Sequence, residues 1–301
     1  MTSPRIRLFI TDLDNTLYDW VSFFTSSFYE MVREAAGLLQ VDEGALLDEL
    51  REVHRRHHNS EHPFALLETP LVQARFPGLS RVEQKKALDD AFHAFNRKRQ
   101  ELLLLYPTVD ATLRTIADLG VPIVGHTEAT VPNAVFRLQK LGIASCFSKL
   151  YAATPPSQEH PDPEFRPDPN PISVRYLAPN ERKPDPAIVL DICRDFGVSP
   201  TETLYVGDSL ARDIGMAQAA GAWAAWARYG TVYEKTHWDR LVRVTHWTPE
   251  DVARADIARK LYGDCVPNQT LDQFGDVLLH YEFTNSGEGK WTTQRPTAMA
   301  R

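Results

Sequence analysis

The stretch that decides the fold is Ile6-Arg7-Leu8-Phe9-Ile10-Thr11-Asp12-Leu13-Asp14. Its apolar first part is typical of a buried β-strand. Two acids separated by one residue follow directly. Open α/β sheets bind their ligands at the carboxyl ends of the strands. The stretch therefore predicts two carboxylates at such an edge, the alternative being a solvated loop that carries two acids after an edge strand.

Two carboxylates this close favour a divalent cation, because hard oxygen ligands suit Mg²⁺. An aspartate held beside a cation can attack a phosphoryl group and form an aspartyl phosphate. The second acid can then protonate the leaving oxygen. The pair Asp12 and Asp14 therefore indicates Mg²⁺-dependent phosphoryl transfer.

Residues 20–104 carry apolar side chains at helical spacing in three successive segments. The pair Ser80 and Glu83 forms a capping-box pattern that opens the third segment. The residues that share a face are Phe24, Phe28, Met31, Val32 and Ala35, then Leu46, Leu47, Leu50, Val53 and His54, then Leu88, Ala91, Phe92 and Phe95. This pattern predicts a small helical bundle.

Strand and helix patterns alternate from Tyr106 to Arg228, which is typical of a parallel sheet. The expected strands are 121–126, 149–153, 204–206 and 222–227, and the expected helices are 109–119, 130–141, 186–196 and 211–220. With the first strand, these elements predict an α/β fold with a doubly wound parallel sheet.

The predicted domains follow from this order. A discontinuous core comprises 1–19 and 105–240, and the helical domain 20–104 is inserted over Asp12 and Asp14. Residues 241–301 form a C-terminal extension with a helix from Thr248 to Leu261, and 285–301 are polar enough to be disordered. The Pro-rich stretch 155–184 is either a structured loop or a mobile flap.

The composition narrows the classes of partner. A net charge of −7 over 301 residues gives no basic field for nucleic acid. Three scattered cysteines indicate a reducing compartment rather than a disulfide framework. No signal-peptide core or run of membrane-spanning length is present. We expect a cytoplasmic protein without a nucleic-acid or membrane partner; the sequence leaves its oligomeric state open.

Three further features lie where strands of the sheet should end. Thr127 can donate to a phosphate oxygen or cap a turn, and Lys183 before a helix can neutralise a phosphate or be a surface lysine. Gly207-Asp208 follows a strand, and Asp213 is either a site residue or a first-turn helix acid. Only a shared site explains the whole set.

In this order the motifs resemble those of the haloacid dehalogenase-like (HAD) hydrolases, from about Ile6 to Arg228. The resemblance implies that Asp12 is the nucleophile and Asp14 the general acid and base, while Thr127 and Lys183 hold the phosphoryl group. It also implies that Asp12, the backbone carbonyl of Asp14 and Asp208 bind Mg²⁺. Asp213 would support the metal or orient Lys183, and residues 20–104 would be a C1-type cap.

The resemblance has two departures: Glu128 stands where many relatives carry asparagine, and the Pro-rich loop is longer than expected. The presence of Asp14 favours phosphate chemistry, since true dehalogenases lack that acid. The segment Asp14-Asn15-Thr16-Leu17-Tyr18 is similar to the corresponding segment of pyrimidine 5′-nucleotidase-like members.

We therefore expect a phosphatase that acts on a small phosphorylated metabolite, such as a nucleotide or a sugar phosphate. Glu128 and the cap residues His54 and Arg55 are candidate substrate contacts, although the cluster His54–His58 also fits a solvated helix end. Two alternatives remain: a phosphomutase on the same core, and a non-catalytic protein that binds metabolites.

Overall fold

The computed structural model describes residues 3–62, 64–155, 170–247 and 249–285. At its centre is a sheet of seven parallel strands in the order β5-β4-β3-β2-β6-β7-β8. The strands are β2 Leu8–Thr11, β3 Ile123–Thr130, β4 Lys149–Ala153, β5 Val174–Leu177, β6 Thr203–Gly207, β7 Trp223–Ala227 and β8 Gln269–Leu271. The predicted α/β fold with a doubly wound parallel sheet is confirmed.

Strand β2 occupies the middle of the sheet because its side chains are apolar on both faces. Phe9 points into one hydrophobic cluster, whereas Leu8 and Ile10 point into the other. Helices α6 Val109–Asp118 and α7 Val131–Lys140 contribute to the cluster around Phe9, and α8 Pro186–Phe196 and α9 Gly215–Ala219 contribute to the opposite one. The first strand is thereby buried on both sides.

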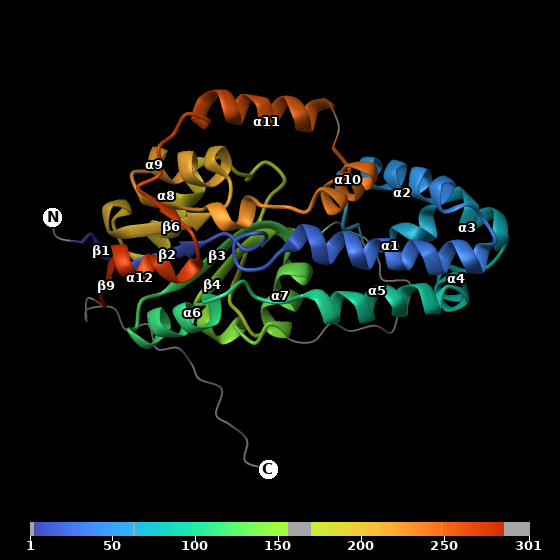
Figure 1. Cartoon of the computed structure of the whole chain (residues 1–301), viewed down its shortest axis with the longest axis horizontal. Helices are drawn as coiled ribbons and strands as arrows, with labels where there is room; N and C mark the ends of the chain where they lie inside the picture. The colour runs from blue at the N-terminus through green and yellow to red at the C-terminus, as the bar shows by residue number, and fades with distance from the viewer. Residues whose placement is uncertain (1–2, 63, 156–169, 248, 286–301) are drawn as a thin grey trace, which may run out of the picture.

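The insertion that follows β2 is entirely helical among its described residues, and its long helices α1 and α5 lie side by side and project from the core (Figure 1). The predicted third helix is in fact two, α4 and α5, which meet at Leu88, and the capping box at Ser80 is present. The elements are α1 Trp20–Leu39, α2 Glu43–His57, η1 Ala65–Glu68, α3 Pro70–Arg75, α4 Arg81–Ala87 and α5 Asp89–Leu102.

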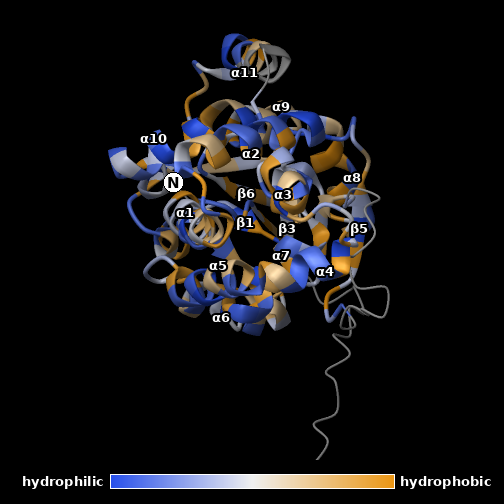
Figure 2. Cartoon of the chain, turned by 90° about the vertical axis from the view of Figure 1, so that its right-hand side faces the viewer, coloured by the Kyte–Doolittle hydropathy of each residue, from blue (hydrophilic) through white to orange (hydrophobic). Residues whose placement is uncertain are grey.

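Apolar residues of the insertion and of the sheet form one continuous cluster. Seen from the end of the insertion, the hydrophobic strands of the core lie behind its helices in the middle of the molecule (Figure 2). The insertion therefore shares a hydrophobic core with the sheet. No helix among the described residues is long and apolar enough to cross a bilayer.

The chain beyond residue 240 takes part in the fold, so the predicted domain boundary at that residue is wrong. Strand β8 extends the main sheet, and β9 Glu282–Phe283 pairs with β1 Arg5–Ile6. These strands are too short to show an alternating pattern in the sequence. The helices here are α10 Lys235–Val244, α11 Pro249–Tyr262 and α12 Val277–His280.

Helix α10 ties the insertion to the core. His237 Nδ1 lies 2.8 Å from Thr25 Oγ1 on α1, and His54 Nδ1 on α2 lies 2.7 Å from the carbonyl oxygen of Val244. Two other sequence predictions fall partly outside the described residues: the disorder at 285–301, and the Pro-rich loop, of which 170–184 is described and contains β5. The remaining short helical turns are η2 Ala144–Cys146, η3 Pro200–Glu202, η4 Leu210–Ile214, η5 Arg228–Thr231 and η6 Phe274–Asp276.

If the C-terminal region is part of the core, Phe274→Ala should destabilise the protein. The ring of Phe274 is fully buried and meets the ring of Phe9 edge-on, with their centroids 5.9 Å apart. We expect a loss of about 3–5 kcal/mol in the free energy of unfolding, measured with denaturant. The control Leu279→Ala, at a side chain that is 75% exposed, should change it by less than about 0.5 kcal/mol. Equal midpoints for Phe274→Ala and the wild type would contradict this assignment.

Candidate active site

The carboxyl ends of three neighbouring strands bring the predicted acids and threonine together. Asp12 follows β2 and Asp208 follows β6, and these strands are paired so that the amide of Asp12 donates to the carbonyl of Val206 at 2.8 Å. Thr127 lies within β3, which continues past the predicted end of that strand to Thr130. The register of the central strands thus places these three residues at one edge.

Lys183 reaches this edge from the segment that precedes α8. Its Nζ donates to Asp12 Oδ1 at 2.5 Å and to Asp213 Oδ1 at 2.7 Å, and the side chain is almost completely buried. Burial opposes the charge of the ammonium group, but Asp12 and Asp213 outweigh it and hold the pKa of Lys183 well above its ordinary value. Lys183 is therefore not the surface lysine of the alternative interpretation.

Asp213 is held in place by its surroundings. It lies in the π-helical turn η4, where its Oδ2 accepts from the amide of Ser209 at 3.0 Å and its Oδ1 accepts from the hydroxyl of Tyr205 at 3.3 Å. A Cβ atom at Gly207 would lie 2.4 Å from Asp213 Cγ, so only glycine leaves room for this side chain. Asp213 is 2% exposed, which excludes a solvated helix acid and supports the predicted role of orienting Lys183.

Carboxylate oxygens of Asp12, Asp208 and Asp213 lie within 4.8 Å of one another. Burial raises the pKa of Asp12 from 3.8 to about 7, and repulsion from Asp213 adds to the rise, while Lys183 counteracts it. Burial, together with Asp12 and Asp213, also raises the pKa of Asp208 well above its usual range. Crowded, desolvated carboxylates of this kind fit a divalent cation such as Mg²⁺.

Asp14 is not part of this carboxylate cluster, and its partner is an arginine, Arg137, rather than Lys183. Its Oδ1 accepts from Nη1 of Arg137 at 2.9 Å, and Nη2 of the same guanidinium binds the carboxylate of Glu61 in the insertion. Arg137 is 2% exposed; burial opposes its charge, but Asp14 and Glu61 keep its pKa above the ordinary value. One buried arginine of α7 therefore connects the second acid of the motif with the insertion.

Sequence reasoning missed Arg137 and Glu61. An arginine between the buried residues Val135 and Leu138 of an amphipathic helix was the available signal, because such a residue is rarely buried without a partner. Glu61 lies in a loop of the insertion, and nothing in its local pattern indicates a contact 76 positions along the chain.

The three predicted substrate contacts outside the motifs lie in different surroundings. His54 is buried and bound to a backbone carbonyl; burial lowers its pKa to about 4, so it is a neutral group and not a cation. Arg55 is paired at 2.9 Å with Glu52 on the outer face of α2 and does not line the cavity described below, so the prediction for it has no support. Glu128 is neutralised by an ion pair with Arg212.

A cavity of about 530 Å³ lies between the insertion and the core beside Asp14. Arg137 and Glu61 form part of its wall, together with His54 and Arg99. The guanidinium of Arg99 stacks on the ring of Phe136 at 3.9 Å, and burial, with the nearby charge of Arg137, lowers its pKa to about 10. The aromatic residues of the wall are Phe23, Phe24, Phe28, Phe64, Phe92, Phe95 and Phe136.

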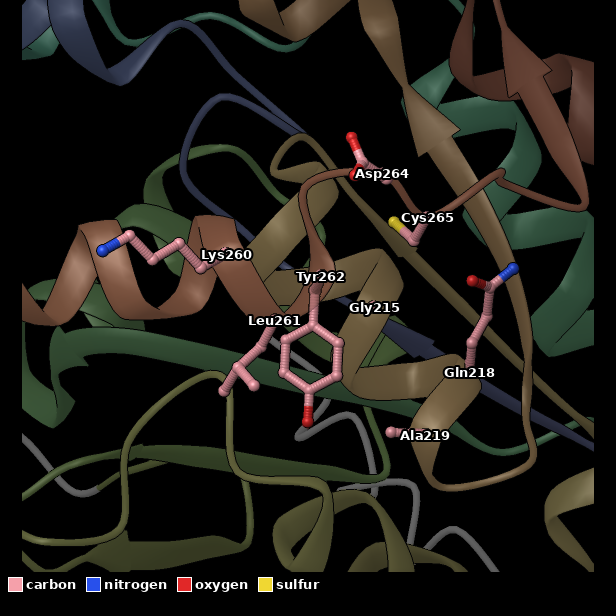
Figure 3. Close-up of a pocket in the computed structure, with 8 residues that line it drawn as sticks. All are labelled: Gly215, Gln218, Ala219, Lys260, Leu261, Tyr262, Asp264 and Cys265. Atoms are coloured by element: carbon pink, nitrogen blue, oxygen red, sulfur yellow. The ribbon is translucent and has the colours of Figure 1, made fainter.

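A second, open hollow of about 470 Å³ lies between α9 and the end of α11, where Tyr262 and Leu261 face Gly215 and Ala219 (Figure 3). No motif residue lines either hollow. The first one lies next to the motif, because Arg137 in its wall binds Asp14, and it is therefore the candidate site for the substrate.

The fold and site define an α/β protein with a cluster of carboxylates and one lysine at the carboxyl edge of a parallel sheet, together with an inserted helical unit. The family profile of haloacid dehalogenase-like hydrolases matches residues 6–221, which is more than half of the chain. The chain belongs to the haloacid dehalogenase-like hydrolases, and the predicted family is confirmed.

Among curated proteins, the chain is 28% identical over 224 residues to a glyceraldehyde 3-phosphate phosphatase of Methanopyrus kandleri, covering 72% of this chain and 81% of that one. It is 30% identical over 152 residues to a phosphoglycolate phosphatase of Pasteurella multocida, covering 50% and 57%. The second match thus spans less than two thirds of that relative. A 2-haloacid dehalogenase structure from Pseudomonas syringae pv. tomato shares the fold, with a TM-score of 0.53 and 20% identity over 91% of this chain and 97% of that one.

The crowding of carboxylates predicts how stability responds to pH and metal. A raised carboxyl pKa means that the folded protein keeps a proton that the unfolded chain loses, so for Asp12 stability falls as the pH rises from about 4 to about 7. In chelator at pH 8, Asp208→Asn should therefore raise the free energy of unfolding by about 1–2 kcal/mol. Thermal unfolding would measure this change.

At pH 5 the difference between Asp208→Asn and the wild type should be small, because the raised carboxyl groups then carry protons. Mg²⁺ should stabilise the wild type and leave the variant nearly unchanged. A variant that is less stable than the wild type at pH 8 in chelator would rule out the crowding of these carboxylates.

Proposed function

We propose that this hydrolase is a Mg²⁺-dependent phosphatase that removes phosphate from a small phosphomonoester through an aspartyl-phosphate intermediate. The observation that carries the proposal is the separation of the two motif acids: Asp12 is bound by Lys183, and Asp14 by Arg137. The two carboxylates therefore have different partners, one in the core cluster and one on an arginine that also binds the insertion, so one can act at phosphorus while the other exchanges protons with the leaving group.

Three contacts orient Asp12 as the nucleophile. Its Oδ1 accepts from Lys183, its Oδ2 accepts from the hydroxyl of Thr16 at 3.1 Å, and its backbone is fixed by β6. The attacking carboxylate oxygen forms a bond to phosphorus while the bond from phosphorus to the leaving oxygen breaks. Asp12, Asp208 and the backbone carbonyl of Asp14 would hold Mg²⁺, which would supply positive charge next to the phosphoryl oxygens.

Asp14 gives its proton to the leaving oxygen and then accepts a proton from the water that attacks phosphorus, which releases phosphate and restores Asp12. In this proposal Thr127 holds the phosphoryl group. Its Oγ1 accepts from the amide of Ala129 at 3.1 Å, so its own proton can be donated to a phosphoryl oxygen. Lys183 neutralises charge at the same place.

The relatives support phosphate ester hydrolysis but differ in substrate. Those described above act on glyceraldehyde 3-phosphate and phosphoglycolate, and a shorter match of 86 residues is to an N-acetylmuramic acid 6-phosphate phosphatase of Pseudomonas aeruginosa. We propose a small phosphorylated metabolite for this chain as well, with residues 20–104 as a C1-type cap. The aromatic wall of the cavity supports a planar leaving group such as a nucleoside. The free cysteines support a cytoplasmic location.

Replacement of the nucleophile gives the first test. With an aryl phosphate and Mg²⁺, Asp12→Asn should lower kcat/KM by about three orders of magnitude or more, because the amide cannot form the intermediate. The control Asp110→Asn removes an acid that is half-exposed on α6 and should leave the rate unchanged. Equal rates for Asp12→Asn and the wild type would refute the assignment, and activity that requires a bisphosphate activator would instead indicate a phosphomutase.

Arg137 is a positioning residue for Asp14 in this proposal. The effect of its replacement on kcat/KM should therefore depend on the leaving group. An alcohol needs a proton when it leaves, whereas an acidic phenol does not. We expect Arg137→Gln to lower kcat/KM about 10- to 100-fold for an alkyl phosphate and much less for a nitrophenyl phosphate. The control Arg114→Gln, which removes an exposed arginine of α6, should affect neither. An equal loss for both substrates would mean that Arg137 has only a structural role.

A further inference from the structure

Two histidines and a glutamate converge in the insertion, away from Asp12. Nε2 of His57, at the end of α2, lies 2.7 Å from Glu68 Oε2, and Nε2 of His62 lies 2.8 Å from Oε1 of the same carboxylate. The two imidazole rings stack in parallel, with their centroids 3.5 Å and their planes 7° apart. Both rings therefore direct the same nitrogen towards one carboxyl group.

We propose that His57, His62 and Glu68 form a second metal site, which binds a transition-metal cation such as Zn²⁺. One ligand atom from each residue lies within 4.8 Å of the others, a spacing that a single ion can bridge. Imidazole nitrogens and a carboxylate oxygen suit Zn²⁺, whereas the oxygen-only cluster in the core suits Mg²⁺. Three protein ligands leave a fourth position for water.

The hydrogen bonds already place Nε2 of both histidines next to the carboxylate of Glu68. A metal would occupy the position of the protons that these bonds share. A metal binds the unprotonated ring nitrogen, so each Nε2 proton would move to Nδ1 or leave when the ion enters.

The solvent exposure of the ligands and the neighbouring positive charge determine which ions can bind at this site. The side chains of His57 and Glu68 are 29% and 15% exposed, so an ion can reach them from solvent. Nη1 of Arg56 lies 3.9 Å from Glu68 Oε2. Any cation competes with this guanidinium group for the carboxylate, which favours a metal with strong affinity for nitrogen over Mg²⁺.

A metal here would fix the loop that contacts the active site. It would join the end of α2 to η1 across the segment that contains Glu61, whose carboxylate binds Arg137. The amide of Glu61 already donates to Asn59 Oδ1 at 2.8 Å, which orders the same turn. The three ligands are not part of the Asp12 cluster, although His62 also lines the cavity beside Asp14. Occupancy of the site can be measured without any assay of activity.

The test uses the full-length chain with Asp208→Asn, which removes one carboxylate of the core cluster. After treatment with a chelator, this protein is titrated with Co²⁺ and its visible absorption is recorded. We expect one equivalent to bind, with the intense bands of a low-coordinate, nitrogen-ligated ion, and Zn²⁺ to displace it. Adding Glu68→Gln or His57→Gln should weaken binding at least about ten-fold, since each removes a ligand.

The control adds His280→Gln instead, which removes an imidazole from α12 on the core and should leave Co²⁺ binding unchanged. Unchanged binding in Glu68→Gln, or absence of the bands in the parent, would overturn the proposal. If a ligand variant does not fold, the parent still decides: Zn²⁺ should raise its unfolding temperature with saturation at one equivalent. No rise at excess Zn²⁺ would overturn the proposal as well.

Discussion

The ion pairs of buried Lys183 with Asp12 and Asp213 are the interaction on which the site depends. They place one positive charge among three carboxylates, of which Asp12 and Asp213 are buried, and burial of such charges is tolerated only when they are paired. The contact requires β2, β6 and the segment before α8 to meet at one edge of the sheet. The fold and the site therefore constrain each other, and the space at Gly207 that admits Asp213 is part of the same arrangement.

A second buried cation, Arg137, gives the two motif acids different partners. Arg137 holds Asp14 on one side and Glu61 of the insertion on the other, so the acid that would handle protons is linked to the unit that covers the site. Asp12, by contrast, is bound by Thr16, Lys183 and the backbone of β6, which among the described residues all belong to the core. In the proposed mechanism, the chemistry at phosphorus would be supported by the sheet, whereas proton transfer to the leaving group would be connected to the insertion. The insertion does not act as a detached lid, because helix α10 fastens it to the core through His54 and His237.

The sequence was sufficient for the central strands and the motif residues, because both have strong local signals. An apolar run that ends in acids indicates a buried strand with its carboxyl end at the site, and parallel strands bring their carboxyl ends together. It was insufficient for β8 and β9, which have two or three residues and are held by pairing rather than by pattern. It was also insufficient for Glu61 and for the surroundings of His54, since both depend on contacts between segments far apart in the chain. The pattern of the polar cluster His54–His58 fits a solvated helix end. In the fold, His54 is buried and Arg55 lies on the surface.

The central claim is that Asp12 becomes phosphorylated while Asp14 moves protons. Its most direct test is to mix the Mg²⁺-loaded enzyme with a substrate, quench in acid within one turnover, and map the phosphorylated peptide by mass spectrometry. The account predicts a phosphoryl group on the peptide that contains Asp12, which is absent from Asp12→Asn and accumulates when Asp14→Asn slows its hydrolysis. Phosphate released within the first turnover with no modification of that peptide, or with modification at another residue, would contradict it.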